Sequence, residues 1–197
     1  ASPESGWSAA QVADDYAQCA AWAAEAGADV VEANYSCPNV CSAEGQVYMD
    51  VDLAGAVTQA VRSGIGDVRL LLKIGVFPDL DLQRSFLKTV ADAADGITLV
   101  NGISREVLHA DGRPVFGENY VKAGVLGRII HEPCVAALSE ARTAIEEENL
   151  DLALVAVGGV SSVADYQDFT VAGADAVLCG SSPMYLPDLA AEIKASL

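Results

Sequence analysis

Two amides, a hydroxyl and a thiol stand together directly after an apolar segment near the start of the chain. Residues 34–39 read Asn-Tyr-Ser-Cys-Pro-Asn, and residues 28–33 before them are mostly Ala and Val. Polar side chains at the end of a buried strand are costly unless a partner or ligand meets them. The pattern therefore indicates a site that holds a small polar molecule and moves a proton, with the Cys37 thiol as base or nucleophile.

Cys37 also has a structural alternative, because most free cysteines are small buried hydrophobes. Pro38 favours an extended backbone at Cys37, and the neighbouring residues are polar, which favours the functional alternative. Cys19 and Cys179 fall on a predicted helix face and in a predicted strand, so we expect them to be structural, while Cys41 is left undecided. No second ligand pair completes a zinc site, so no metal is expected.

Single polar side chains are also predicted near the ends of two later strands. Lys73 falls in the apolar run 70–75, and Asn101 closes the run 97–100. A lysine in a buried strand needs a partner, and it could either extend toward solvent or face an anionic cofactor or intermediate. An asparagine at a strand end could either cap a turn or contact a flat, amide-rich ligand.

Glycine-containing turns follow the last two predicted strands. Gly158 and Gly159 precede a Val-Ser-Ser sequence, and Gly180 precedes Ser181 and Ser182. Glycine lets the backbone approach a ligand closely, and free N–H groups with the dipole of the next helix attract an anion. The two turns predict a phosphate site, and tight turns without a ligand are the alternative.

Strand-like and helical segments alternate along the whole chain. Nearly continuous apolar runs predict buried strands at residues 28–34, 68–75, 96–101, 151–158 and 174–180. Helices are predicted at residues 8–27, capped by Ser8, and at 50–63, 79–94, 133–149, 162–172 and 187–196. Strict alternation of this kind indicates a parallel sheet with crossover helices.

The polar strand ends favour one of two parallel architectures. A doubly wound dinucleotide-binding fold should show G-x-G-x-x-G after its first strand, and the sequence has no such string. A (β/α)8 barrel of the TIM type gathers chemistry at the carboxyl ends of its strands, as this chain does. Because five strands are fewer than eight, we expect one incomplete α/β barrel domain over residues 1–197, without the first three strands.

The segment 102–132 has little periodicity and is predicted to be a long functional loop over the active face of the barrel. His109 and His131 are single histidines in loops, and we expect both at the surface. Acidic residues such as Asp79 and Glu147 are expected on solvated helix faces.

The composition is that of a globular protein and excludes several kinds of partner. Of 197 residues, 52% are hydrophobic and 20% are charged, and the net charge is −17. Such an acidic chain offers no basic surface to nucleic acid or to an anionic membrane. No apolar run reaches the length of a membrane span. Cysteines without regular spacing indicate a reducing compartment, so a cytoplasmic location is expected.

These residues together resemble the dihydroorotate dehydrogenase family of FMN-dependent barrel enzymes. Residues 34–40, Asn-Tyr-Ser-Cys-Pro-Asn-Val, are similar to the family's catalytic-loop motif N-x-S-x-P-N. Lys73 falls where the family has a lysine that contacts the flavin. Val100 and Asn101 match the strand end at which an asparagine meets the substrate, so Val100 would contact FMN and Asn101 the substrate. Residues 123–128, which include Gly124, are similar to the Gly-rich segment that passes the flavin. The positions that match the loops around the FMN phosphate are Gly158, Gly159, Gly180 and Ser181.

The resemblance implies the oxidation of dihydroorotate, a dihydropyrimidine, to orotate. Cys37 would remove a proton next to a carbonyl while a hydride passes to FMN, and a cysteine at this place points to the soluble branch of the family. Lys73 would stabilise negative charge on the flavin and act with Cys37 in catalysis. Asn34 would contact both FMN and substrate. The resemblance also implies a small-molecule substrate. The acidic composition predicts no nucleic-acid or membrane partner, and a homodimer is the expected assembly. The substrate-binding residues would be Asn34, Asn39, Asn101 and Gly102.

Departures from the family pattern keep other hypotheses open. The family usually has Ser or Thr after the substrate-binding asparagine, where this chain has Gly102, and the residues after Asn39 also differ. A second hypothesis is therefore a related flavin enzyme acting on another dihydropyrimidine or an enone. A third is a non-redox, phosphate-binding lyase or isomerase that forms a Schiff base on Lys73. A fourth is that this chain alone is an inactive fragment.

Overall fold

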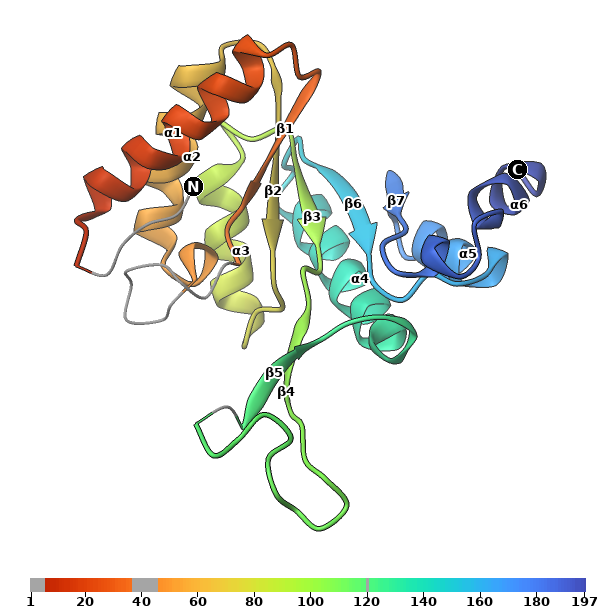
Figure 1. Cartoon of the computed structure of the whole chain (residues 1–197). Coiled ribbons are helices and arrows are strands. Elements are labelled where there is room, and N and C mark those ends of the chain that lie inside the picture. Colours follow the sequence, from red (N-terminus) through yellow and green to blue (C-terminus); the bar gives the residue numbers. More distant parts are fainter. Residues whose placement is uncertain (1–5, 37–45, 120) are drawn as a thin grey trace.

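Five parallel strands form the main sheet, and each lies where a strand is predicted (Figure 1). This computed structural model describes residues 6–36, 46–119 and 121–197. Each strand is shorter than the apolar run that predicts it. The strands are β1 (Val30–Asn34), β2 (Arg69–Ile74), β3 (Gly96–Leu99), β6 (Ala153–Val157) and β7 (Ala176–Leu178).

The strands stand in the sheet in the same order as in the sequence, β1-β2-β3-β6-β7, and all neighbours are parallel. A doubly wound sheet reverses its order at a switch point, whereas a (β/α) barrel adds each new strand on the same side of the last. The order therefore confirms the barrel architecture. Within the described residues the sheet is open, with β1 and β7 as its two edges.

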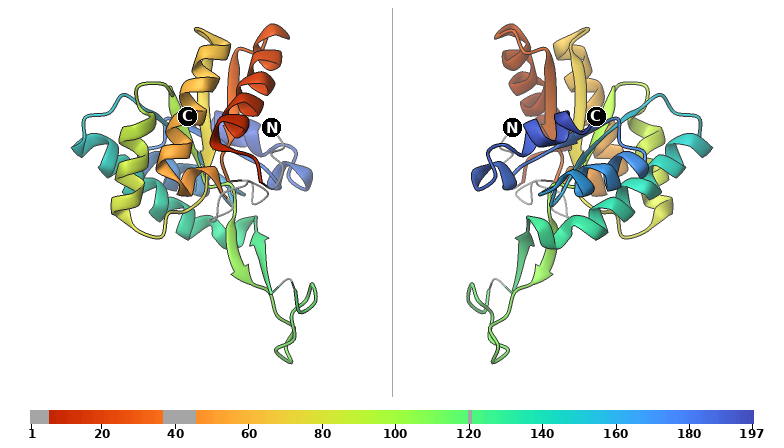
Figure 2. Two further views of the ribbon diagram at one scale, coloured as in Figure 1. Left: turned by 90° about the vertical axis from the view of Figure 1, so that its left-hand side faces the viewer. Right: turned by 90° about the vertical axis from the view of Figure 1, so that its right-hand side faces the viewer.

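In the described part of the chain, α-helices connect the strands and consecutive helices contact each other from α1 to α6 (Figures 1 and 2). Short 3-10 helices precede α2, α4 and α6. None of the described helices is both long and apolar enough to cross a bilayer. The helices are α1 (Ala9–Glu25), α2 (Val51–Ile65), α3 (Leu80–Val90), α4 (His131–Glu147), α5 (Val163–Val171) and α6 (Leu189–Ala195), with the 3-10 helices η1 (Val47–Met49), η2 (Arg128–Ile130) and η3 (Ser182–Met184).

Capping side chains explain where two of the helices begin. The hydroxyl of Ser8 accepts the Gln11 N–H at 3.3 Å, while Oε1 of Gln11 accepts the Ser8 N–H at 2.9 Å. This reciprocal pair is a capping box, and it confirms Ser8 as the N-cap of α1. Asp79, predicted on a solvated helix face, instead caps α3 by accepting the N–H of Leu82 at 2.8 Å.

Alternate side chains of each strand face two different environments. On β2, Leu70, Leu72 and Ile74 are buried against the helices, and these residues belong to the hydrophobic core. Leu71 and Lys73 lie between them in sequence, so they point to the opposite face and are only partly buried. The core therefore fills the space between the sheet and the helical layer.

The opposite face of the sheet, here called the inner face, is only partly covered. Val30 on β1 is 47% exposed and Leu178 on β7 is 42% exposed. The strand register places Asn34, Lys73 and Thr98 in one row across this face. In a closed barrel such rows fill the interior. The exposure of the edge residues thus follows directly from the open arc.

Residues 102–132 contain an antiparallel hairpin, so the prediction of an irregular loop is wrong. β4 (Ile103–Glu106) pairs with β5 (Lys122–Val125), and a further bridge joins Leu108 to Pro114. The hairpin projects beyond the carboxyl ends of the main strands (Figures 1 and 2). Three of the four residues of β4 are exposed, so the strand lacks the apolar run by which the others were predicted.

At the amino ends of the strands, Asp95 joins a helix to two strands. It precedes β3 and accepts the N–H of Leu70 on β2 at 2.8 Å. Arg62 of α2 donates to the same carboxylate and also to the carbonyl oxygen of Ala93 at 2.8 Å. The carboxylate therefore fixes α2 against the β2–β3 pair.

The same arrangement recurs around Asp175, which precedes β7. Asp175 accepts the N–H of Leu154 on β6 at 2.7 Å and a hydrogen bond from Arg142 of α4 at 2.7 Å. Arg142 also donates to the carbonyl oxygen of Gly173. The same Arg–Asp arrangement therefore fixes two separate helices, α2 and α4, against the sheet. Both arrangements lie at the end of the strands opposite the polar carboxyl ends.

Candidate functional site

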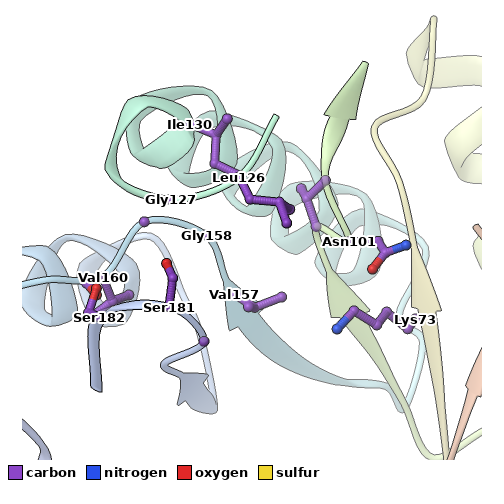
Figure 3. A pocket seen from close by; sticks show the side chains of 13 residues that line it. Lys73, Asn101, Leu126, Gly127, Ile130, Val157, Gly158, Val160, Ser181 and Ser182 are labelled. Carbon is purple, nitrogen blue, oxygen red and sulfur yellow. The ribbon is translucent and has the colours of Figure 1, made fainter. Parts of the chain in front are cut away.

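A cavity of about 260 Å³ opens where the carboxyl ends of β2, β3, β6 and β7 come together (Figure 3). In (β/α) barrels this end of the strands carries the active site. Several residues that were predicted from separate segments line this one cavity. They are Lys73, Val100, Asn101, Gly158, Gly159, Gly180 and Ser181.

Lys73 supplies the cavity with a cation. Its side chain is 23% exposed, and its Nζ lies 3.9 Å from Oε1 of Glu32 on β1. Oε2 of Glu32 accepts a 2.7 Å hydrogen bond from Oγ1 of Thr98, which fixes the carboxylate between strands. At 3.9 Å the Lys73–Glu32 pair is beyond hydrogen-bond distance, so it leaves the ammonium donors available. Sequence reasoning missed Glu32, whose signal is a carboxylate inside an otherwise apolar strand.

Gly158 and Gly159 form a turn that other residues could not adopt without strain. Their φ angles are 149° and 72°. A Cβ on Gly158 would lie 2.4 Å from Sγ of Cys134, and one on Gly159 would lie 2.7 Å from the carbonyl oxygen of Gly127. Among the described residues, no acceptor takes the N–H of Gly159. The turn therefore offers closely approachable backbone with a free donor, which suits an anion.

The turn after β7 completes this side of the cavity. In Figure 3 the Ser181 side chain lies at the cavity, next to Ser182 and Val160. The hydroxyl of Ser182 donates to the carbonyl oxygen of Val160 at 2.5 Å, which ties the two glycine turns together. The N–H groups of Gly180 and Ser181 have no acceptor within the described part of the chain.

The segment between β5 and α4 forms a further wall of the cavity. The residues that line the cavity differ from Gly124, the residue of this region that was predicted to contact the flavin. Leu126, Gly127 and Ile130 line the cavity. Gly124 lies within β5 and Gly102 lines a different cavity. The structure therefore does not bring Gly124 and Gly102 to the cavity that Lys73 lines.

Two of the predicted amide residues, Asn101 and Asn34, lie near the cavity at the ends of two different strands. Asn101 follows β3 and lines the cavity, and its N–H is held by the carbonyl oxygen of Ile74 at 2.9 Å. Asn34 ends β1 and pairs in register with Lys73, but it is exposed at the sheet edge. Its Oδ1 accepts the N–H and the hydroxyl of Ser36, at 3.2 Å and 3.0 Å.

Tyr35 anchors the chain just before the segment that was predicted to be catalytic. Its ring is fully buried, and its hydroxyl lies 2.9 Å from Oγ1 of Thr58. Burial raises the pKa of Tyr35 well above its usual value, so the phenol is a neutral structural group. Cys37, Asn39 and Cys41 lie outside the described residues, and their predicted roles stay predictions.

The described cysteines are Cys19, Cys134 and Cys179, and all are free thiols. Burial raises the pKa of Cys134 to about 11, and burial also raises the pKa of Cys179. Both therefore stay neutral near physiological pH and lack the thiolate that a nucleophile or base needs. The expectation that Cys179 is structural agrees with its packing against the core.

His131 is buried, so the prediction that it lies at the surface in a loop is wrong. It is the first residue of α4 and is 2% exposed. The helix begins two residues earlier than the predicted 133, and α5 covers the ring. His109 is exposed near the tip of the hairpin, as predicted.

A sequence model of the family described as dihydroorotate dehydrogenase matches residues 5–197. The chain belongs to the dihydroorotate dehydrogenase family. This membership agrees with the resemblance of the catalytic-loop motif and of the glycine turns.

Curated relatives from distant organisms show the same family. The dihydroorotate dehydrogenase of Dictyostelium discoideum is 30% identical over 180 residues, which cover 89% of this chain and 49% of the relative. The catalytic subunit of dihydroorotate dehydrogenase B (NAD(+)) from Staphylococcus carnosus is 28% identical over 187 residues, 94% of this chain and 58% of the relative. This chain thus spans about half the length of these dihydroorotate dehydrogenases.

Solved structures of the family share the fold. The crystal structure of a dihydroorotate dehydrogenase from Eimeria tenella in complex with ferulenol superposes with a TM-score of 0.74 at 18% identity. The match covers 94% of this chain and 53% of that chain. The likeness shows that the five-stranded arc has the fold of the matching part of that dihydroorotate dehydrogenase.

Proposed function

We propose that this chain forms part of an FMN-dependent oxidoreductase that oxidises dihydroorotate to orotate, with Cys37 as the base. The observation that carries the proposal is the single cavity shared by Lys73, Asn101 and the two glycine turns. Residues 1–197 would be the carboxyl-terminal part of one barrel domain. The thiol base would place the protein in the soluble, cysteine-type branch of the family, with a cytoplasmic location and a homodimeric assembly.

The cavity residues fit the phosphate of FMN. The N–H groups of Gly159, Gly180 and Ser181, which have no acceptor among the described residues, offer donors to an anion together with the Ser181 hydroxyl. The described lining includes no carboxylate, although the chain has a net charge of −17. Local backbone donors can therefore hold a phosphate that the overall charge would repel.

The opposite end of the cavity suits the flavin ring. FMN, when bound, supplies the acceptor for the hydride of the substrate. The cavity extends from the glycine turns to Lys73, so a phosphate in the turns leaves Lys73 for the ring (Figure 3). A fixed ammonium stabilises negative charge that develops beside it in a site partly shielded from water. Glu32 holds this ammonium near the inner face without occupying its donors.

The substrate would lie between this cavity and the segment that follows Tyr35. Cys37 would act as a thiolate, after its thiol proton has passed to solvent, and would become a thiol again by accepting the proton next to the substrate carbonyl; the reference pKa of a free cysteine is about 8.5. The amides of Asn34, Asn39 and Asn101 would orient the pyrimidine, with Gly102 beside them. The contacts of Asn34 with Ser36 support this arrangement, because they fix the backbone where the catalytic segment begins.

The Cys37→Ser variant tests the proposal. We expect the reduction of bound FMN by dihydroorotate to slow by at least about a hundredfold, because a serine hydroxyl is a far weaker acid than a thiol and its deprotonated, basic form is hardly populated near neutral pH. FMN content should stay the same, since Cys37 contributes nothing to the phosphate turns. The measurement is stopped-flow absorbance of FMN under anaerobic conditions. Cys19→Ser, on α1, is the matched control and should react like the unmodified protein; a Cys37→Ser rate within about twofold of normal would remove Cys37 from the mechanism.

Gly102 favours a second substrate class, because it brings no hydroxyl to the place where the family usually has Ser or Thr. A related dihydropyrimidine or an enone is therefore the second candidate. Parallel assays with dihydroorotate and dihydrouracil separate the two candidate substrates. If dihydrouracil reduces FMN and dihydroorotate does not, orotate formation is excluded. The Schiff-base alternative predicts two other results. The protein would retain no FMN, and borohydride would trap a carbonyl substrate on Lys73. Both results together would contradict the redox proposal.

A further inference from the structure

Glu32 stands on the inner face of the sheet, one row below Lys73. In the strand register Glu32 lies beside Leu71, whereas Lys73 and Thr98 lie in the row nearer the carboxyl ends of the strands. Glu32 is the charged residue of β1, whose other residues are Val, Ala and Asn. A carboxylate inside a parallel sheet costs free energy unless partners meet it, so its contacts need an explanation.

The side chain of Glu32 extends across β2 to β3. Its Oε2 accepts a 2.7 Å hydrogen bond from Oγ1 of Thr98, and β2 separates the strands of these two residues. Thr98 is fully buried, and within the described part of the chain its hydroxyl donates to no other acceptor. The hydroxyl therefore fixes one oxygen of the carboxylate on the β3 side.

The second oxygen of the carboxylate faces Lys73. Oε1 of Glu32 lies 3.9 Å from Nζ of Lys73, and among the described residues no other carboxylate pairs with this ammonium. The shorter contact is a hydrogen bond and the longer one is an ion pair without a hydrogen bond. Thr98 thus holds Glu32 at a distance from which it offsets the charge of Lys73 but takes none of its donors.

Lys73 lines the cavity of Figure 3, whereas Glu32 and Thr98 do not. Glu32 lines a separate hollow next to α1, at the edge of the sheet. A ligand in the cavity therefore contacts the ammonium and not the carboxylate. The negative charge of Glu32 acts on such a ligand through space and through the position of Lys73.

We propose that Glu32 is a positioning residue that, held by Thr98, offsets part of the Lys73 charge and so limits how strongly the site favours reduced over oxidised FMN. The inference rests on the proposed function, because it needs the flavin ring beside Lys73. Thr98 sets the size of the effect, since its hydrogen bond keeps the carboxylate from bonding directly to the ammonium.

The signs of the charges give the direction of the effect. Negative charge on the flavin ring grows when the ring accepts a hydride, so the Lys73 ammonium favours the reduced form and the Glu32 carboxylate opposes it. Loss of the carboxylate charge therefore raises the reduction potential of FMN. Loss of the Thr98 hydroxyl lowers it, because the freed carboxylate moves to Lys73 and accepts a hydrogen bond from the ammonium.

The test measures the two-electron reduction potential of FMN bound to this chain, by equilibration with a reference dye at one pH near neutrality. Glu32→Gln removes the charge and keeps an acceptor for Thr98. At a given solution potential we expect its ratio of reduced to oxidised FMN to rise about tenfold, or about 30 mV for a two-electron couple. Thr98→Val keeps the branched side chain, and its ratio should fall about threefold, or about 15 mV.

Further variants separate charge from packing. The double variant Glu32→Gln/Thr98→Val should match Glu32→Gln, since Thr98 acts through the carboxylate charge. Glu148→Gln is the matched control, because Glu148 also pairs with a lysine, Lys88 at 2.9 Å, but on the outer helices, and its ratio should not change. Melting temperatures of all variants report on folding. Glu32→Met, which also removes the charge, takes the place of Glu32→Gln if the amide variant does not fold.

A merely structural role of Glu32 and Thr98 predicts a different pattern, because both single variants would then loosen Lys73 and shift the potential in the same direction. Shifts of the same sign, or a Glu32→Gln potential that is not above that of the unmodified protein, would overturn the inference while FMN binding itself stands. Failure of the unmodified chain to bind FMN would overturn the proposed function together with the inference.

Discussion

Lys73 and Glu32 face each other on the inner face, and their separation decides how much positive charge the cavity offers. Thr98 donates to Glu32, so the carboxylate is already engaged when it approaches Lys73 at 3.9 Å. A long ion pair of this kind restrains the ammonium weakly and leaves its donors for a ligand. The position of the Lys73 ammonium is thus restrained, while its N–H donors can still bind a ligand.

Lys73→Met tests whether this cation serves a ligand. We expect FMN to bind between about tenfold and a hundredfold more weakly, because a charge-assisted hydrogen bond contributes about 1.5–3 kcal/mol. The measurement is flavin fluorescence titration at fixed salt. Lys88→Met is the matched control. Lys88 also pairs with a carboxylate, that of Glu148, but Lys88 lies on the outer helix α3, away from the cavity. Equal affinities in the two variants would count against a cofactor role for Lys73.

Single residues were predictable from sequence where their chemistry conflicts with their surroundings. Lys73 and Asn101 stand out as polar residues in apolar runs, and the structure places both at the cavity. His131 gave no such signal, because its burial depends on α5, which lies about thirty residues away in sequence. The contacts of the buried Asp165 carboxylate were hidden in the same way, since its partners come from more than one segment.

At the scale of elements, the two glycine turns differ in what they require. A Cβ on Gly159 would meet the backbone of Gly127 at 2.7 Å, at a φ of 72°. A Cβ on Gly180 would meet no atom within 4 Å. The first glycine is needed for the fold of the turn itself, whereas the second leaves open space beside the cavity.

We therefore expect Gly159→Ala to lower the free energy of unfolding by about 1–3 kcal/mol even without FMN. Gly180→Ala should leave it within about 0.5 kcal/mol of normal. Urea unfolding of both variants, followed by circular dichroism, gives the comparison. If Gly180→Ala weakens FMN binding while stability is unchanged, the open space belongs to the ligand. Equal loss of stability in both variants would contradict the difference between the turns.

The Arg–Asp units at the amino ends of the strands connect stability to pH. Burial acts to raise the pKa of Asp95, but hydrogen bonds from Leu70, Arg69 and Arg62 lower it below its usual range. A depressed pKa means that the stabilisation is present above the unfolded-state pKa and is lost as pH falls through the folded-state value. The unit around Asp95 should thus fail in acid.

Asp95→Asn should cost about 2 kcal/mol of unfolding free energy at about pH 7, because it removes charge-assisted hydrogen bonds. The difference from the unmodified protein should shrink as the pH is lowered below about pH 4, from the unfolded-state pKa of an aspartate toward the lower folded-state pKa of Asp95. Asp175→Asn is the control of the same type, and its greater exposure predicts a smaller cost. A difference that stays constant with pH would show that Asp95 does not contribute through its charge.

Elements were predictable from sequence where burial leaves an apolar run. All five strands of the main sheet have this pattern, because strands of parallel sheets are typically covered on both faces. The hairpin of β4 and β5 was missed, since its strands are short and largely exposed, and pairing between them is a tertiary choice. The 3-10 helix before α4 was also missed, and it moves the start of α4 to His131.

At the scale of the whole molecule, the described residues form an arc with one covered face. The helices bury the outer face, while Val30 and Leu178 remain exposed on the inner face of the two edge strands. Exposed edges with apolar side chains promote pairing between chains. The net charge of −17 opposes such contacts, because like-charged molecules repel each other at low salt.

The balance between these two effects gives the last prediction. This chain alone should associate more strongly as salt is added, because screening weakens the repulsion and leaves the apolar contacts. Val30→Lys should reduce the association, since it places a charge on the inner face of edge strand β1. Val171→Lys makes the same change in charge at a valine that is 88% exposed on α5, outside the sheet, and should behave like the unmodified chain. Sedimentation velocity over a range of concentrations at low and high salt distinguishes the three proteins. A chain that stays monomeric at high salt, with a single cooperative unfolding transition, would show that the open arc is stable by itself.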